Sequence, residues 1–175
     1  YEKEIQYHLQ YELENIYKNE YIEKKWDINS EDFKIINLCY LKLIIYSIMI
    51  FEDFNRPKNA RIIENLLAKH SSKEITLGIM QIKTDQLITD EQSIFLGINK
   101  IMKSFSVYLV NYGESGYNYS RDCIDLILKD YNLGEEYSGS VTSIFDTLSK
   151  KIYQQDLIDM WFNNLKTSIQ KDETN

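Results

Sequence analysis

The stretch IIYSIMIFED spans residues 44–53 and places two carboxylates at the end of an apolar run. Upstream, Asn29-Ser30 is an N-cap signal followed by two acidic residues, so we expect a helix from about Glu31 to Phe51. This helix is apolar on nearly all faces, which favours a place in the core. A carboxylate at its end lies at the edge of a low-dielectric region, where desolvation raises its pKa. Glu52 is therefore a candidate general acid.

A second informative stretch, TLGIMQI, occupies residues 76–82. Its apolar positions suit a strand better than a helix, and we expect a short β-ribbon or an extended turn near residues 74–84. Gly78 permits close approach of the backbone, either by a sugar or by the central helix. Taken alone, the pattern equally describes a buried hairpin that has no contact with a substrate.

Together, Glu52 at a helix end and Gly78-Ile79-Met80-Gln81 downstream resemble the lysozyme-like superfamily, in particular the lytic transglycosylases and the goose-type lysozymes. The resemblance extends over roughly residues 38–153. It implies a predominantly α-helical α+β fold, with Glu52 as the catalytic acid/base. It also implies that Gly78, Met80 and Gln81 line the substrate cleft.

A tyrosine in the cleft is a further implication of the resemblance. The family usually carries Tyr-Asn followed by Gly, whereas this chain has Asn111-Tyr112-Gly113, with the first two residues reversed. We take Tyr112 as the substrate-binding tyrosine, with Tyr108 and Tyr117 as alternatives. Without the resemblance, the sequence indicates only that Gly113 ends a helix and that the tyrosines around it are exposed.

The number of carboxylates at the site separates two mechanisms. Retaining and inverting glycosidases use two. Asp53 points about 100° away from Glu52 on a helix, and Asp90 is explained by the first turn of a helix. The resemblance to lytic transglycosylases implies the single-glutamate scheme, in which the glutamate protonates the glycosidic oxygen and the sugar's 6-hydroxyl closes an anhydro ring.

We therefore expect a transglycosylase or muramidase that cleaves peptidoglycan strands in the cell envelope. Two alternatives stay open: a lysozyme-like module that has lost catalysis and binds glycan or a partner protein, and an unrelated helical stalk or assembly protein. No cofactor is implied, and the surroundings of His70 lack the ligand spacing of a metal site. A net charge of -7 argues against nucleic-acid binding.

The organisation predicted for the 175 residues is simple, because six glycines and one proline favour long helices over a turn-rich β fold. Residues 1–28 are expected to form an N-terminal helix, which either packs on the core or is a stalk from a membrane anchor removed upstream. Residues 29–170 would form the lysozyme-like domain, and residues 171–175 a frayed tail. The central helix is too short for a clear membrane span.

Further helices follow from apolar spacing. One is expected from Arg61 to Lys69 with its isoleucines and leucines facing inward, and one from a capping box at Thr89 to about Val110. A short helix is expected at residues 120–131 and a last one from about Val141 to Ile169. Arg56 or Arg61 is a candidate to hold Glu52 or a substrate group, although Arg61 also suits a weak surface pair with Glu64. Cys39 and Cys123 are expected as free thiols, with one disulfide as the alternative.

Overall fold

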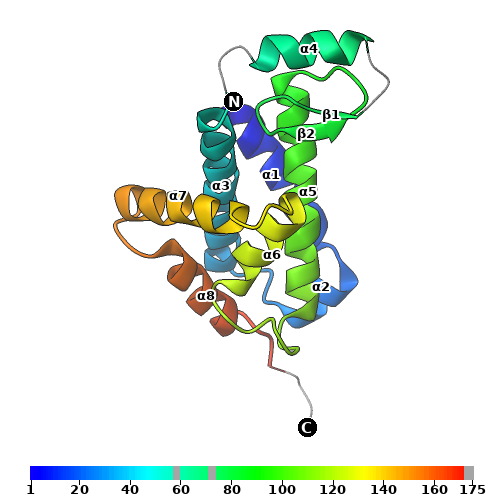
Figure 1. Cartoon of the computed structure of the whole chain (residues 1–175). Helices are drawn as coiled ribbons and strands as arrows, with labels where there is room; N and C mark the ends of the chain where they lie inside the picture. The colour runs from blue at the N-terminus through cyan, green and yellow to red at the C-terminus, as the bar shows by residue number, and fades with distance from the viewer. Residues whose placement is uncertain (57–59, 71–73, 172–175) are drawn as a thin grey trace.

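Eight helices and one β-hairpin make up the described part of the chain in the computed structural model, which covers residues 1–56, 60–70 and 74–171 (Figure 1). The elements, in chain order, are α1 Glu2–Tyr17, α2 Glu20–Lys25, α3 Glu31–Phe54, α4 Ala60–His70, β1 Ile75–Leu77, β2 Ile82–Thr84, α5 Asp90–Asn111, α6 Asp122–Tyr131, α7 Tyr137–Ile152 and α8 Leu157–Thr167. The expected predominantly α-helical α+β architecture is confirmed. The two strands pair antiparallel, with Leu77 opposite Ile82.

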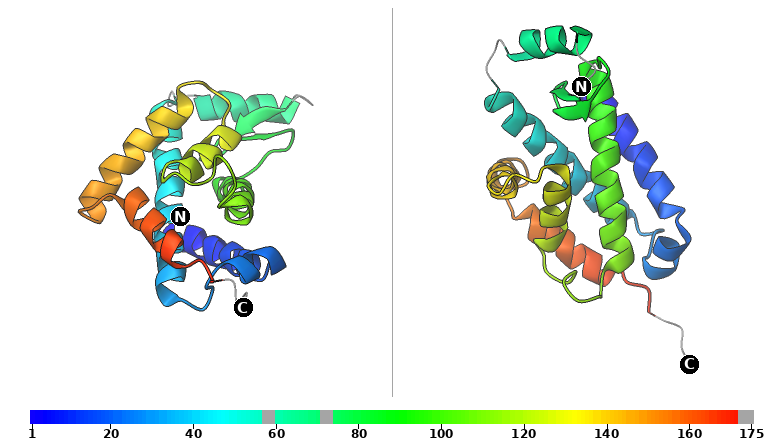
Figure 2. Two further views of the ribbon diagram at one scale, coloured as in Figure 1. Left: turned by 90° about the horizontal axis from the view of Figure 1, so that it is seen from below. Right: turned by 45° about the vertical axis from the view of Figure 1, so that its right-hand side comes forward.

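Helix α3 is the element against which the others are arranged. It begins as predicted, since the Ser30 side chain accepts a hydrogen bond from the Phe33 amide, but it continues to Phe54, three residues beyond the expected end. Glu52 therefore lies within its last turn. Helices α1, α7 and α8 all pack against α3, and α1 also packs against α5 (Figure 2).

Helix α5 carries the predicted capping box: the Thr89 side chain accepts from the Gln92 amide, and the Gln92 side chain accepts from the Thr89 amide. Its N-terminal end lies beside the β-hairpin and its C-terminal end beside α2 (Figure 1). Both α3 and α5 are long and apolar enough to cross a membrane by composition. In this fold their apolar residues form much of the core, which is the arrangement expected for the central helix.

The N-terminal helices belong to the same core. Helix α1 buries Ile5, Leu9 and Leu13, which pack with residues of α3 and α5. The single helix expected over residues 1–28 is instead two, because the Asn19 side chain accepts from the amides of Tyr21 and Ile22 and starts a new helix. Residues 1–28 thus share one core with the rest of the described chain.

A buried amide joins α1, α3 and α8. Asn37 is fully buried, its Oδ1 accepts from the Trp161 indole at 2.9 Å, and its Nδ2 donates to the Tyr17 hydroxyl at 3.2 Å. Trp161 in turn stacks on Tyr40 with ring centres 4.2 Å apart. Each polar atom of this network depends on Asn37, because buried donors without a partner carry a large desolvation cost.

Asn37→Ala is expected to lower the free energy of unfolding by about 2–4 kcal/mol, because it leaves the Trp161 indole N–H and the Tyr17 hydroxyl unpaired and opens a small cavity. Urea unfolding followed by tryptophan fluorescence measures the change. Asn163→Ala, at an exposed position of α8, is the matched control and should cost well under about 1 kcal/mol. Equal losses in both variants would contradict the network's importance.

The prediction of a single last helix from Val141 to Ile169 is wrong. Helix α7 begins earlier, at Tyr137, and ends at Ile152; a turn with Gln154 at φ 55° follows. Asp156 then accepts from two amides at the start of α8. Apolar spacing runs through this region without a break and therefore predicts one helix. The chain nevertheless starts a new helix here, because Asp156 caps it and Ser149 Oγ accepts from the Leu157 amide.

Helix α4 has the expected bounds to within one residue, but the opposite orientation. Its isoleucines and leucines at positions 62, 63, 66 and 67 are all exposed, while Ala60, Glu64 and Ala68 share the less exposed side. The cause is the ion pair between Glu64 and Arg56, which turns the polar stripe towards the body of the protein. Inward-facing apolar residues were therefore a wrong prediction for this helix.

The two thiols and the tail complete the fold. Cys39 and Cys123 are free, as expected, so no disulfide joins α3 to α6. The frayed tail was expected at residues 171–175, of which 172–175 lie outside the described residues.

Candidate active site

Glu52 lies half-buried in the last turn of α3, whereas its neighbour Asp53 is exposed. Burial raises the pKa of the Glu52 carboxyl above its ordinary value, and the approaching Tyr137 hydroxyl and the positive charge of Arg56 offset part of that rise. The two neighbouring carboxylates therefore occupy different environments, as the 100° step of a helix predicts. Only Glu52 faces the protein.

Arg56 connects the end of α3 to two other elements. Its guanidinium donates to the Gly78 carbonyl oxygen at 3.1 Å and forms an ion pair with Glu64 of α4. Only 8% of its side chain is exposed. Of the two arginines that were candidates to act on Glu52, Arg56 is near enough to affect its pKa, and the side chain of Arg61 lies outside the described residues.

The turn between β1 and β2 consists of residues 78–81 and is closed by its own groups. Gly78 has a φ of 73° and Gln81 a φ of 50°. The Gly78 carbonyl accepts from both the backbone amide and the side-chain amide of Gln81, each at 3.1 Å. The Gln81 side chain, which the resemblance places in the substrate cleft, thus bonds to the backbone of its own turn.

Helix α5 supports this turn from behind. The Met80 amide donates to Ser93 Oγ at 2.8 Å, and Met80 itself is fully buried against Gly97. A Cβ on Gly78 would lie 2.1 Å from the Cβ of Ser93. The close approach observed at Gly78 is thus to α5, whereas the sequence suggested a sugar or the central helix.

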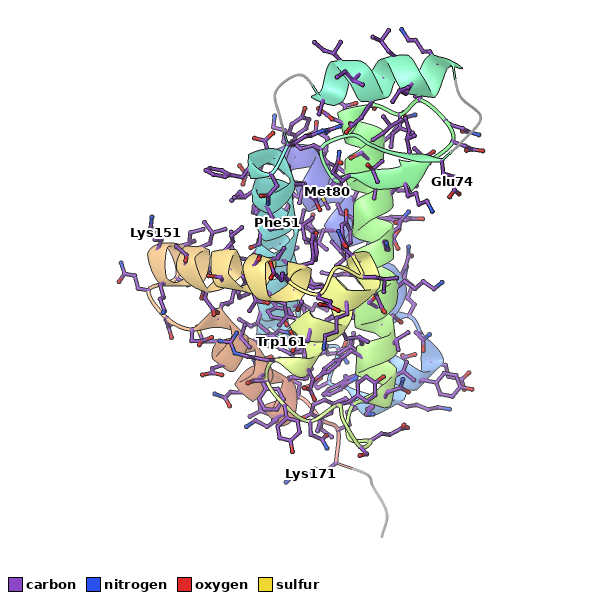
Figure 3. All side chains as sticks on the ribbon, viewed as in Figure 1. Phe51, Glu74, Met80, Lys151, Trp161 and Lys171 are labelled. Carbon is purple, nitrogen blue, oxygen red and sulfur yellow. The ribbon has the colours of Figure 1, made fainter. Side chains whose placement is uncertain are left out.

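Two tyrosines that sequence reasoning did not single out complete the site. The Tyr131 hydroxyl on α6 donates to the Met80 carbonyl at 2.6 Å, and the ring of Tyr137 on α7 meets Phe51 edge-on with ring centres 5.0 Å apart. Figure 3 labels Phe51 and Met80, which lie in the same region, above α7 in that view. Burial, with the negative charge of Glu52 adding to it, raises the pKa of both tyrosines. Both hydroxyls are therefore protonated near neutral pH.

The Tyr137 hydroxyl is a potential hydrogen-bond donor to Glu52. It is buried, and it approaches the Glu52 carboxylate closely enough to lower the pKa of that carboxyl group. It does not reach the geometry of a full hydrogen bond to any group in the described part of the chain. With fourteen tyrosines in the sequence, no spacing or motif marks this one; only the packing of α7 on α3 reveals it.

Tyr112 does not belong to this site. It follows the C-terminal end of α5, at the opposite end of that helix from the hairpin (Figure 1). It is 93% buried, its ring packs against Trp26 with centres 5.2 Å apart, and its carbonyl accepts from Lys25. The alternative Tyr108 is a core residue of the same aromatic cluster. A cleft role for Tyr112 is therefore corrected to a structural one.

A polar hollow of about 220 Å³ adjoins the turn on the side of α4. It is lined by Arg56, Asn65, Gly78, Ile88, Thr89 and Asp90. Asp90, as expected, lies in the first turn of α5, and it accepts from the Tyr1 hydroxyl. Among the described residues no group of three or more histidines, cysteines and carboxylates is arranged to hold a metal ion.

The raised pKa of Glu52 predicts a pH-dependent stability. Burial favours the protonated carboxyl in the folded state, so the stability it contributes is full below the unfolded pKa and is lost as the pH rises through the folded pKa. Glu52→Gln, which cannot ionise, is therefore expected to be more stable than the wild type near pH 7, with the difference shrinking towards pH 4. Urea unfolding at both pH values measures this.

The control for that measurement is Asp53→Asn, the same chemical change at the exposed neighbouring position. It should alter the free energy of unfolding much less than Glu52→Gln. A gain from Glu52→Gln that is the same at both pH values would show that charge burial is not its cause.

The site can therefore present a partly desolvated carboxyl group that is influenced by an arginine and two protonated tyrosines, and Arg56 and Tyr131 also bind the carbonyl oxygens of Gly78 and Met80 in the turn. Comparisons with known proteins add nothing to this geometry, since no protein-family model, no curated protein and no solved structure matches the chain.

Proposed function

We propose that the protein cleaves the glycan strands of peptidoglycan, with Glu52 as its single acid/base, by the lytic transglycosylase or muramidase type of reaction. The observation that supports this most is the half-buried Glu52 carboxyl, whose pKa is raised by burial and which is influenced by Arg56, the residue that donates to the Gly78 carbonyl of the turn. General acid catalysis needs a carboxyl that is still protonated near the working pH. Because the substrate is the cell wall, the activity belongs to the cell envelope.

The chemistry divides among the residues as follows. Glu52 gives its proton to the glycosidic oxygen as the bond to the anomeric carbon breaks, and the substrate's own acetamido group supports the positive charge. Glu52 then takes the proton of the 6-hydroxyl as that oxygen bonds to the anomeric carbon. Tyr137 supplies a neutral O–H donor beside the carboxylate in its ionised form. Arg56 fixes the turn relative to the end of α3.

The contrast between Glu52 and the carboxylates described near it supports the single-glutamate scheme. Glu52 is half-buried, and burial raises the pKa of its carboxyl group. Asp53 and Asp85 are exposed, and Asp90 accepts from Tyr1 at the start of α5. A hydrolase of the inverting kind needs two carboxyl groups about 6.5–9.5 Å apart, with a water between them.

A glycan-binding module without catalysis is the second candidate, and one observation favours it. The Gln81 amide is engaged by the Gly78 carbonyl and Met80 is fully buried, so the turn offers few side chains to a sugar. Such a module would use the same surface but would leave the bond intact.

Digestion of purified peptidoglycan followed by mass analysis of the soluble fragments tests the proposal. Anhydro-muramyl products are expected. Products with a reducing end would instead mean hydrolysis and a second carboxylate. Sedimentation of the protein with intact peptidoglycan and no soluble product would overturn the catalytic proposal in favour of the binding module.

A further inference from the structure

Arg56 lies four residues after Glu52. On a helix, an acidic residue placed four positions before a basic one is in the favourable order for an ion pair between the two side chains. Asn55, with φ -85° and ψ 1°, nearly continues α3, so this spacing still applies at Arg56. Local sequence therefore predicts an ion pair between Glu52 and Arg56. No ion pair joins these two side chains, both of which the structure describes, and Arg56 acts on Glu52 through its charge.

Glu64 on α4 holds the guanidinium instead. Arg56 Nη2 pairs with the Glu64 carboxylate, and Arg56 Nη1 donates to the Gly78 carbonyl oxygen at 3.1 Å. The side chains of Arg56 and Glu64 are only 8% and 23% exposed. An ion pair shielded from solvent in this way is screened little by salt, and losing one partner leaves the other charge buried. The guanidinium is thus held by two elements that follow α3 in the chain.

The orientation of α4 follows Glu64 and not its aliphatic residues. Four aliphatic side chains of this helix are each 51–62% exposed: Ile62, Ile63, Leu66 and Leu67. Each would contribute roughly 1.5–3 kcal/mol if it were fully buried. The helix instead keeps Glu64 on its less exposed side, where the carboxylate reaches Arg56. The place of Glu64 is therefore a specified feature of this fold.

The groups that act on Glu52 differ in charge. Two of them are tyrosine hydroxyls, neutral near neutral pH, on α6 and α7: Tyr131 and Tyr137. Arg56 carries a positive charge, whereas Asp53 is exposed to solvent. A guanidinium in direct contact with the Glu52 carboxylate would favour its ionised form and lower the pKa further. That contact would take away the proton that a general acid needs.

We propose that Glu64 is a positioning residue for Glu52: it holds the Arg56 guanidinium on α4 and so prevents the i,i+4 ion pair that would otherwise keep Glu52 ionised. Glu64 acts only through Arg56, and its negative charge also weakens the field of the guanidinium at Glu52. The consequence for cleavage rests on the proposed function. The consequence for the ionisation of Glu52 does not.

NMR titration of the Glu52 side-chain carboxyl carbon in the whole protein tests the proposal without a substrate. The signal is assigned by its loss in Glu52→Gln. Glu64→Gln should lower the pKa of Glu52, because the released guanidinium turns to the nearby carboxylate. Arg56→Met should raise that pKa, because the positive charge is removed. With Arg56→Met already present, Glu64→Gln should change the pKa much less.

The opposite signs separate this role from a merely structural one. If the ion pair between Arg56 and Glu64 only holds α4 in place, losing either partner lets water reach Glu52, and both variants lower its pKa. That result, or an unchanged pKa in Glu64→Gln, would overturn the proposal. Circular dichroism checks that the variants are folded. If Glu64→Gln does not fold, Glu64→Met, which is also uncharged and of similar length, should give the same lowering.

Glu74→Gln is the matched control. It removes a carboxylate from an ion pair with Lys83 on the neighbouring hairpin, where both side chains are largely exposed. Exposed charges are screened by solvent and salt, so the pKa of Glu52 should stay nearly unchanged. An equal lowering in Glu74→Gln and Glu64→Gln would show a general effect of net charge and would also overturn the proposal.

The pH profile of peptidoglycan cleavage extends the test to the reaction. A general acid acts only while it is protonated, so the alkaline limb of the profile follows the pKa of Glu52. Glu64→Gln should move this limb to lower pH, and Arg56→Met should move it to higher pH. Absence of cleavage by the wild type would reject the proposed function but not the titration result, so the two failures are distinguishable.

Discussion

Glu52→Gln is expected to lower the release of anhydro-muramyl fragments by about 10²–10⁴-fold, which is the range that a positioned general acid contributes. Gln has nearly the same shape as Glu but carries no acidic proton, so the variant should keep the fold and the approach of Tyr137 and Arg56. Digestion of purified peptidoglycan with mass analysis of the soluble fragments measures the change. Peptidoglycan binding, measured by sedimentation, should be retained.

Asp53→Asn is the control that separates catalysis from general effects of charge. It makes the same chemical change one residue away, on the exposed side of the same helical turn, and should leave the cleavage rate within about twofold, since surface changes away from a site have small effects. Unchanged cleavage by Glu52→Gln would remove Glu52 from the mechanism. A similar loss in both variants would point to electrostatic attraction of the substrate and not to proton transfer.

Gly78→Ala is expected to lower the free energy of unfolding by about 2–5 kcal/mol. Its φ of 73° costs an L-residue roughly 1–2 kcal/mol. The added methyl group would also meet Ser93, whose Cβ lies 2.1 Å from the position it must occupy, and forced overpacking of this kind costs about 1–3 kcal/mol more. Because the turn also holds the Met80 carbonyl against Tyr131, the variant should disturb the site as well. Urea unfolding gives the stability change.

Gly113→Ala supplies the comparison that isolates the steric part. Gly113 also has a positive φ, of 95°, but a Cβ there meets no atom within 4 Å. Its cost should be only the backbone strain, about 1–2 kcal/mol. If both alanine variants lose the same stability, the turn has moved away from α5 at no cost, and Ser93 does not constrain it.

Local sequence signals determined most of the helices and the hairpin. The caps at Ser30 and Thr89 each fix an amide at a helix start, and this chemistry is complete within four residues. The strand pattern around Gly78-Ile79-Met80-Gln81 likewise depends on neighbours in the chain. The half-buried position of Glu52 followed from its place at the end of an apolar helix. These features needed no knowledge of what packs against them.

What only the tertiary structure decided involves residues distant in sequence. Tyr131 and Tyr137 reach the Glu52 region because α6 and α7 pack there. Tyr112 lies outside that region because α5 is long enough to place its C-terminal end far from the hairpin. The outward orientation of α4 depends on the ion pair between Arg56 and Glu64. Apolar spacing along a helix shows that one face is apolar, but it does not show whether that face points towards the core or towards solvent. That choice is made by the partners on other elements, and here a charge pair and two alanines occupy the inner side.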